Sequence, residues 1–155
     1  MNIRFRMVRR AIGFGTAGGI AAAAFVHAAW ARGSTWPRSS PDELARLVVG
    51  QGRAPSPAAC WAVAGLLSAA SLAVVTDICR PATYGGKRAL VRPLSRWGSR
   101  STAGALLASG AGGLVVSGTG VVATSDEFRR QDLRVYSPLC LALGAGAAAI
   151  AWNPR

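Results

Sequence analysis

One histidine, one aspartate and one tyrosine are the residues of this sequence best suited to proton chemistry. His27 is the only histidine among the 155 residues and lies in a run that carries no charge. Asp132 and Tyr136 precede a second such run, in the segment DLRVYSPLCLALG. An ionisable group inside a membrane is costly, so its presence is a functional hypothesis by default. His27 could carry a proton or act as a general base, with Asp132 or Tyr136 orienting its imidazole ring.

The candidates for binding a ligand are three further residues that we predict on the same side of the protein as His27, namely Trp30, Trp36 and Arg130. A simpler interpretation is that His27 hydrogen-bonds a neighbouring helix near the headgroups, where burial is only partial, and we favour it. One histidine, with no second histidine or carboxylate at ligand spacing, predicts no metal site. The sequence has no P-loop, nucleophile elbow, dinucleotide loop or paired-carboxylate motif, so we expect no cofactor and favour a protein that is not an enzyme.

The elements that would position these residues are four long segments with almost no charge. The chain is 51% apolar and only 15% charged, and its charges are clustered. The charge-free segments predict spans at about 11–31, 58–79, 101–124 and 136–153, each near the length of about 20 residues that a helix needs to cross a membrane. A soluble bundle would need polar faces at helical spacing, which these segments lack. We therefore predict an all-α membrane protein, a single domain over 1–155 built as a four-transmembrane-helix bundle.

Basic residues predict the orientation. The segment MNIRFRMVRR has four arginines and no acid, and residues 80–100 hold six lysines and arginines with no acid. The positive-inside rule therefore places both termini in the cytoplasm of a bacterial cell, in a multi-pass plasma-membrane protein. The five tryptophans fall at predicted span ends, as aromatic belts do. The basic excess needs no nucleic-acid partner, because no nucleic-acid motif accompanies it. A cleaved signal peptide ending near Ala31 is the alternative for the first span, although that apolar run is long.

The two long connections have patterns of their own. The outer loop, 32–57, contains a short amphipathic helix at 41–49, in which Ser40 and Glu43 form a capping box. The basic inner loop, 80–100, carries arginines four residues apart, although Pro93 interrupts the pattern, and it is suited to anionic lipid headgroups; the four arginines are Arg88, Arg92, Arg96 and Arg100. Ser137 and Pro138 are typical of the N-cap and first residue of the fourth helix.

Small residues and cysteines bear on assembly. The third span is rich in glycine, which favours either a tight bundle interior or a seam between copies of the chain. The sequence is therefore compatible with a homo-oligomer or with a protein partner. Cys60 and Cys140 belong to the predicted outer side, where the two thiols could form a disulfide, although unpaired thiols are the commoner case.

The chain resembles one known family. His27-Ala-Ala-Trp30, Gly33-Ser-Thr-Trp36-Pro37, Pro57-Ala-Ala-Cys60 and FRRQDLRVYSPLCLALG are similar to positions of the domain of unknown function 3995 (DUF3995) family. That family consists of small four-span membrane proteins common in actinobacteria, and the similarity runs from about Ala22 to Ala149. The resemblance implies topology and a concentration of recognisable positions on the outer side. It implies no activity.

Three function classes follow. We expect first a non-enzymatic integral membrane protein, a small structural or accessory component of the cell membrane. The alternative is a membrane-embedded enzyme or binder of a lipid or apolar small molecule that uses an outer-facing cluster of His27, Asp132 and Tyr136. A channel or transporter through the third span is a third class, but the chain has no acid at mid-depth in a predicted span.

Overall fold

The structure is a computed structural model that describes residues 3–50, 54–79 and 91–152, with backbone alone at 91–95. Within these ranges the chain is helical and has no strand. The elements in chain order are α1 (Ile3–Ala31), α2 (Pro41–Val48), α3 (Pro57–Cys79), α4 (Val91–Thr119), α5 (Asp126–Gln131), the π-helical turn η2 (Asp132–Tyr136) and α6 (Ser137–Trp152). The predicted all-α fold is confirmed.

Among the described residues, four helical stretches are long and apolar enough to cross a membrane. They are α1, α3, the part of α4 from Arg96 to Thr119, and the continuous run of α5, η2 and α6. Large apolar side chains of these stretches are exposed, among them Phe25, Leu66 and Val115. Helices satisfy their own backbone hydrogen bonds, so such side chains can face lipid without exposing polar backbone. The predicted four-transmembrane-helix bundle is confirmed.

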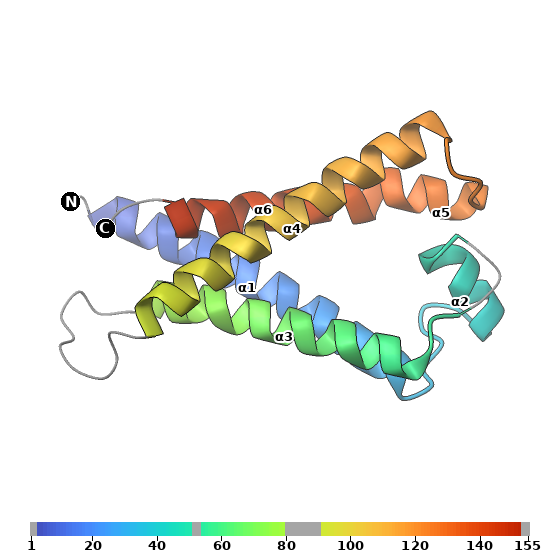
Figure 1. Ribbon diagram of the computed structural model, residues 1–155, viewed down its shortest axis with the longest axis horizontal. Helices are drawn as coiled ribbons and strands as arrows, with labels where there is room; N and C mark the ends of the chain where they lie inside the picture. Colours follow the sequence, from blue (N-terminus) through green and yellow to red (C-terminus); the bar gives the residue numbers. More distant parts are fainter. Residues whose placement is uncertain (1–2, 51–53, 80–90, 153–155) are drawn as a thin grey trace.

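The helices pack as two pairs, α1 with α3 and α4 with α6. The start of α1 and the end of α6 lie at one end of the bundle, which we call the terminal end, whereas α2 and α5 lie at the opposite end, the loop end (Figure 1). The two pairs approach one another in the terminal half and diverge toward the loop end, where α2 lies between them (Figure 1). The short helix predicted at 41–49 is present as α2.

The core lies in the terminal half, where all four long helices meet. Ile20, Val74 and Ile150 are its largest apolar side chains and are almost fully buried, together with Ala17, Ala103 and Ala147. Small residues allow this close approach. A Cβ atom at Gly146 of α6 would lie 2.0 Å from Thr16 Oγ1 of α1, so the Thr16 side chain packs directly on the α6 backbone.

Helix α4 differs from its prediction at both ends. It begins at Val91, so the last ten residues of the predicted inner loop 80–100 are helical. Pro93 is its third residue, where the backbone N–H has no partner within the helix and a proline costs little. The helix ends at Thr119 rather than near 124, because Gly120 has a φ of 68° that stops it.

The expectation that Ser137 caps the fourth helix is wrong. Ser137 has helical dihedral angles (φ −65°, ψ −47°), and the helix runs through it from Asp126. The true N-cap is Ser125, whose hydroxyl accepts a hydrogen bond from Phe128 N at 3.1 Å. Ser and Pro together favour a helix start, but here Pro138 lies inside a helix that widens just before it.

Candidate functional site

The predicted site residue Asp132 begins the π-helical turn at the loop end of α6. Pro138 has no N–H group, and its ring would crowd the carbonyl of the residue four positions earlier. The turn from Asp132 to Tyr136 is wider than an α-helix, and Ser137 N–H donates to the carbonyl of Asp132, five residues back. Such π turns occur often at functional sites, because they point a side chain in a direction that a regular helix cannot.

The Asp132 carboxyl group is buried between α4 and α6, and only 7% of the residue is exposed. Both of its oxygens accept hydrogen bonds. Ser117 Oγ of α4 donates to Oδ2 at 2.5 Å, and Ser137 Oγ donates to Oδ1 at 2.9 Å. A buried carboxyl group is stable only when its oxygens find such donors. The two hydroxyls therefore make Asp132 a bridge between the helices.

Gly113 makes room for this bridge. A Cβ atom at position 113 would lie 2.2 Å from Ser137 Oγ and 3.0 Å from Asp132 Oδ2. Any side chain there would displace the serine, the carboxyl group or both. The glycine of α4 and the acid of η2 thus form one structural unit.

Arg129 binds the end of α4 beside the same bridge. Its Nε donates to the carbonyl of Ser117 at 2.6 Å, and its Nη2 donates to the carbonyl of Gly118 at 3.5 Å. These carbonyls belong to the last turn of α4, where the helix dipole favours a positive charge. Ser117 therefore contacts Arg129 through its carbonyl and Asp132 through its hydroxyl.

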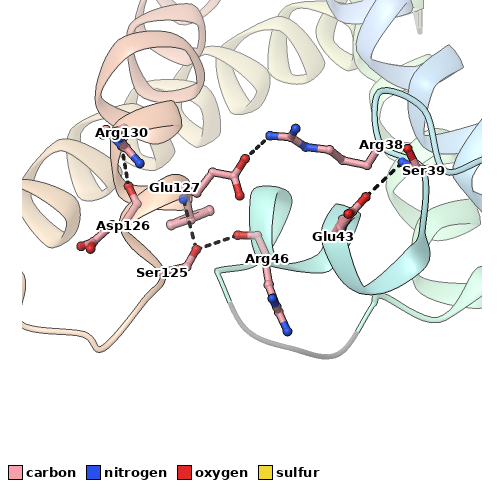
Figure 2. A network of polar contacts seen from close by, with 9 residues as sticks. Arg38, Ser39, Glu43, Arg46, Ser125, Asp126, Glu127 and Arg130 are labelled. Atoms are coloured by element: carbon pink, nitrogen blue, oxygen red, sulfur yellow. Dashed lines mark hydrogen bonds and ion pairs between the residues drawn. The ribbon is translucent and has the colours of Figure 1, made fainter.

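A second polar network joins the first connection to the start of α5 (Figure 2). Ser125 Oγ donates to the carbonyl of Arg46 at 2.8 Å, and Ser125 N donates to the carbonyl of Gly50 at 3.1 Å. Arg38 forms an ion pair with Glu127. We call these contacts the loop-end clasp, because they connect the segment after α1 to the segment after α4.

Within α2 the capping box is present in a modified form. Glu43 N donates to Ser40 Oγ at 3.3 Å, and the Glu43 carboxylate accepts from Ser39 N at 3.2 Å rather than from Ser40 N. Leu44 and Leu47 are buried.

His27 belongs to a separate aromatic group on α1. Its Nδ1 donates to the carbonyl of Ala23 at 2.9 Å, one turn earlier in the same helix. Its ring contacts Trp30 edge-on, with centroids 5.0 Å apart. Trp30 Nε1 in turn donates to the carbonyl of Trp36 at 2.7 Å, which anchors the chain that leaves α1, while 67% of Trp36 itself is exposed.

The structure brings only some of the predicted site residues together. Tyr136 packs beside Phe128, with ring centroids 6.4 Å apart, and Arg130 Nε donates to the carbonyl of Asp126 at 3.3 Å. Among the residues that the structure describes, no hydrogen bond joins His27 to Asp132 or Tyr136. Similar predicted depth was the reason for grouping them, and depth does not fix lateral position in a bundle.

Four arginines were predicted to contact lipid headgroups. Arg88 lies outside the described residues, and Arg92 is described only as backbone in the first turn of α4. Arg96 is exposed. Arg100 is half-buried, and its guanidinium carbon lies 5.7 Å from the centroid of the Trp152 ring, at cation–π distance.

The described residues form neither a metal-binding cluster nor a disulfide. These residues contain no group of three or more His, Cys, Asp or Glu side chains that could hold a metal ion. Cys60, Cys79 and Cys140 are free thiols, so Cys60 and Cys140 do not form a disulfide. Sequence reasoning missed Ser117, Gly113 and Arg129, because each gains its role only from the packing of α4 on α6.

Comparison with known proteins identifies a family and nothing narrower. No curated protein and no solved structure matches the chain. The model of one family, described as "Protein of unknown function (DUF3995)", matches residues 20–147. This match extends from the first membrane helix into the last and includes the Asp132 bridge and the loop-end clasp. The chain therefore belongs to the DUF3995 family.

Proposed function

We propose that this protein is a non-enzymatic integral membrane protein, a small structural or accessory component of the cell membrane. The observation that carries the proposal is the state of Asp132, whose two carboxyl oxygens are both taken by hydroxyls of its own bundle. A catalytic carboxyl group needs an oxygen within reach of a substrate or of a partner base. Two other predicted site residues likewise use a polar atom within the fold: His27 Nδ1 donates to a carbonyl of its own helix, and Trp30 Nε1 donates to a carbonyl of the chain that follows it.

An accessory protein also needs a surface for a partner, and α4 supports this part of the proposal. Gly104, Ala108 and Gly112 are exposed and follow one another at four-residue spacing. A Cβ atom at Gly104 or Gly112 would meet nothing within 4 Å. Small residues at this spacing let a second helix approach closely, whether from a partner or from another copy of the chain.

A stability scan of five of the six site candidates separates this function from the enzyme or binder alternative. Catalytic groups are commonly kept at a cost in stability, so their replacement often raises the unfolding temperature. We expect D132N to lower the unfolding temperature of the full-length protein in detergent, and H27A, W36A, R130Q and Y136F to lower it or leave it unchanged. Thermal unfolding followed by circular dichroism provides the measurement. A clear rise for H27A or D132N would instead indicate an active site.

We propose that the terminal end faces the cytoplasm of a bacterial cell, and thiol labelling tests this orientation. Cys79 is exposed at the terminal end, whereas Ser39 is exposed in the segment beside α2. With a membrane-impermeant maleimide, we expect S39C to label in intact cells and the wild-type protein to label only after permeabilisation. Wild-type labelling in intact cells, with none added by S39C, would reverse the orientation.

A further inference from the structure

Two arginines and one serine at the terminal end carry buried polar atoms without a hydrogen-bond partner. Within the described residues these atoms are Arg9 Nε, Ser99 Oγ and Arg100 Nε. Buried polar groups are nearly always paired, so each exception calls for a reason, such as an absent ligand. All three belong to the terminal halves of α1 and α4, in contrast to Asp132 near the loop end, both of whose carboxyl oxygens accept a hydrogen bond.

The Arg9 guanidinium lies against the last turns of α6. Its Nη2 donates to the carbonyl of Ile150 at 3.1 Å. The dipole of α6 favours a cation at this position, which fixes the guanidinium in place. The Nη2 of the guanidinium group therefore has an acceptor, whereas its Nε–H has none.

Arg9 also lies on the wall of a cavity of about 60 Å³ between α1 and α6. The other lining residues are apolar: Phe5, Val8, Ile12, Ala149 and Ile150. Phe5, Val8 and Ile12 are between 43% and 58% exposed, so this wall continues onto the outer surface of a membrane-crossing helix. The cavity has about the volume of two water molecules, but its mostly apolar wall is better suited to a hydrocarbon chain.

Arg100 borders the same last turn of α6 from the side of α4. Its guanidinium stacks over Trp152, two residues after the Ile150 that binds Arg9. Two half-buried cations, each with an unpaired Nε–H, therefore flank the end of one helix. An oxyanion is the acceptor that a guanidinium prefers.

Local charge selects the same kind of ligand. The α1 sequence contributes Arg4, Arg6, Arg9 and Arg10 and no acid. Asp77 of α3 is the acidic residue of this end, and it does not line the cavity. A negatively charged headgroup is attracted to such a surface and a zwitterionic one much less.

We propose that the terminal end binds one anionic phospholipid. Its phosphodiester oxygens accept hydrogen bonds from Arg9 and Arg100, and an acyl chain packs against Phe5, Val8 and Ile12. The occupant is a lipid rather than free phosphate, because the cavity beside Arg9 has apolar walls and opens on the lipid-facing side of α1. This proposal goes beyond the accessory function and does not depend on it, since an enzyme of the same fold would have the same site.

Native mass spectrometry of the full-length protein in detergent tests the site. The probes are dioleoylphosphatidylglycerol and dioleoylphosphatidylcholine, which share acyl chains and differ in charge. We expect one phosphatidylglycerol to be retained in preference to phosphatidylcholine, and R9Q/R100Q to weaken its binding by at least about tenfold, because two charged hydrogen bonds are lost. R4Q/R6Q is the matched control: it removes the same number of positive charges from exposed positions, so it should weaken phosphatidylglycerol binding much less than R9Q/R100Q does.

Other outcomes would overturn the proposal. Equal retention of the two lipids, or equal weakening in both double variants, would indicate diffuse attraction instead of a site. Competition by millimolar inorganic phosphate would indicate a free-anion site. The variant A149L keeps every arginine and fills the cavity, so it covers the case in which R9Q/R100Q does not fold. Unchanged phosphatidylglycerol binding by folded A149L would contradict the acyl-chain contact, whereas its loss would support it.

Discussion

Replacing Asp132 with alanine should lower the free energy of unfolding of this protein by about 2–4 kcal/mol, since two buried hydroxyls lose their acceptor. Ser117 Oγ and Ser137 Oγ both donate to this carboxyl group, and Ser137 is only 1% exposed. The serines can turn back to carbonyls of their own helices, which limits the loss. The substitution also leaves a small void at the seam of α4 and α6.

The variant D132N should cost less, about 1 kcal/mol, because an amide can still accept from one hydroxyl and donate to the other. Reversible unfolding of the full-length protein in mixed micelles provides the measurement. D126A is the matched control: Asp126 is an exposed acid in the first turn of α5, and its loss should cost no more than about 1 kcal/mol. If D132A is as stable as D126A, the carboxyl group does not hold the two helices together.

Much of the fold follows from the distribution of charge in the sequence. Helices with charge-free stretches of about 20 residues have few alternatives in lipid, because a spanning segment must satisfy its own backbone. The capping box of Ser40 and Glu43 identified α2 for a similarly local reason. These two signals, one acting over a span and the other within one turn, were therefore reliable.

The candidate site depended on information that is not local. Helix α4 has glycines on several faces, at positions 104, 110, 112, 113 and 118. A helix with small residues all round gives no periodic indication of the face that it buries. Whether Ser117 faces Asp132 or lipid could therefore not be predicted. The same difficulty applies to His27, whose predicted depth matched that of Asp132 although its hydrogen bond is made within α1.

The π turn was hidden for a different reason. Ser137 and Pro138 have the types expected at a helix start, and local preference alone favoured that interpretation. Tertiary structure overrode it, because the Ser137 hydroxyl is used by Asp132 and not by the backbone two or three residues ahead. The widened turn from Asp132 to Tyr136 precedes Pro138, so the helix continues through the proline while the Asp132 carboxyl group reaches Ser137.

The face that α4 buries can be tested with two glycines two residues apart. A Cβ atom at Gly110 would lie 2.8 Å from the backbone carbonyl oxygen of Ser137 and 2.7 Å from Leu141 Cγ, whereas one at Gly112 would meet nothing within 4 Å. A backbone oxygen cannot move aside as a flexible side chain can. We expect G110A to lower the free energy of unfolding by about 1–3 kcal/mol through overpacking.

The variant G112A should be neutral or more stable by up to about 1 kcal/mol, because alanine is the better helix former. The same micelle unfolding experiment compares the two variants, which are identical in composition and differ only in the face that carries the methyl group. Equal effects would mean that α4 does not pack on α6 through Gly110.

The bulkier variant G112L tests the exposed face of α4. It should leave the monomer folded. If a second copy of the chain packs on this face, G112L should abolish the dimer that light scattering measures. A destabilised G112L monomer would show instead that this face is already occupied within the bundle.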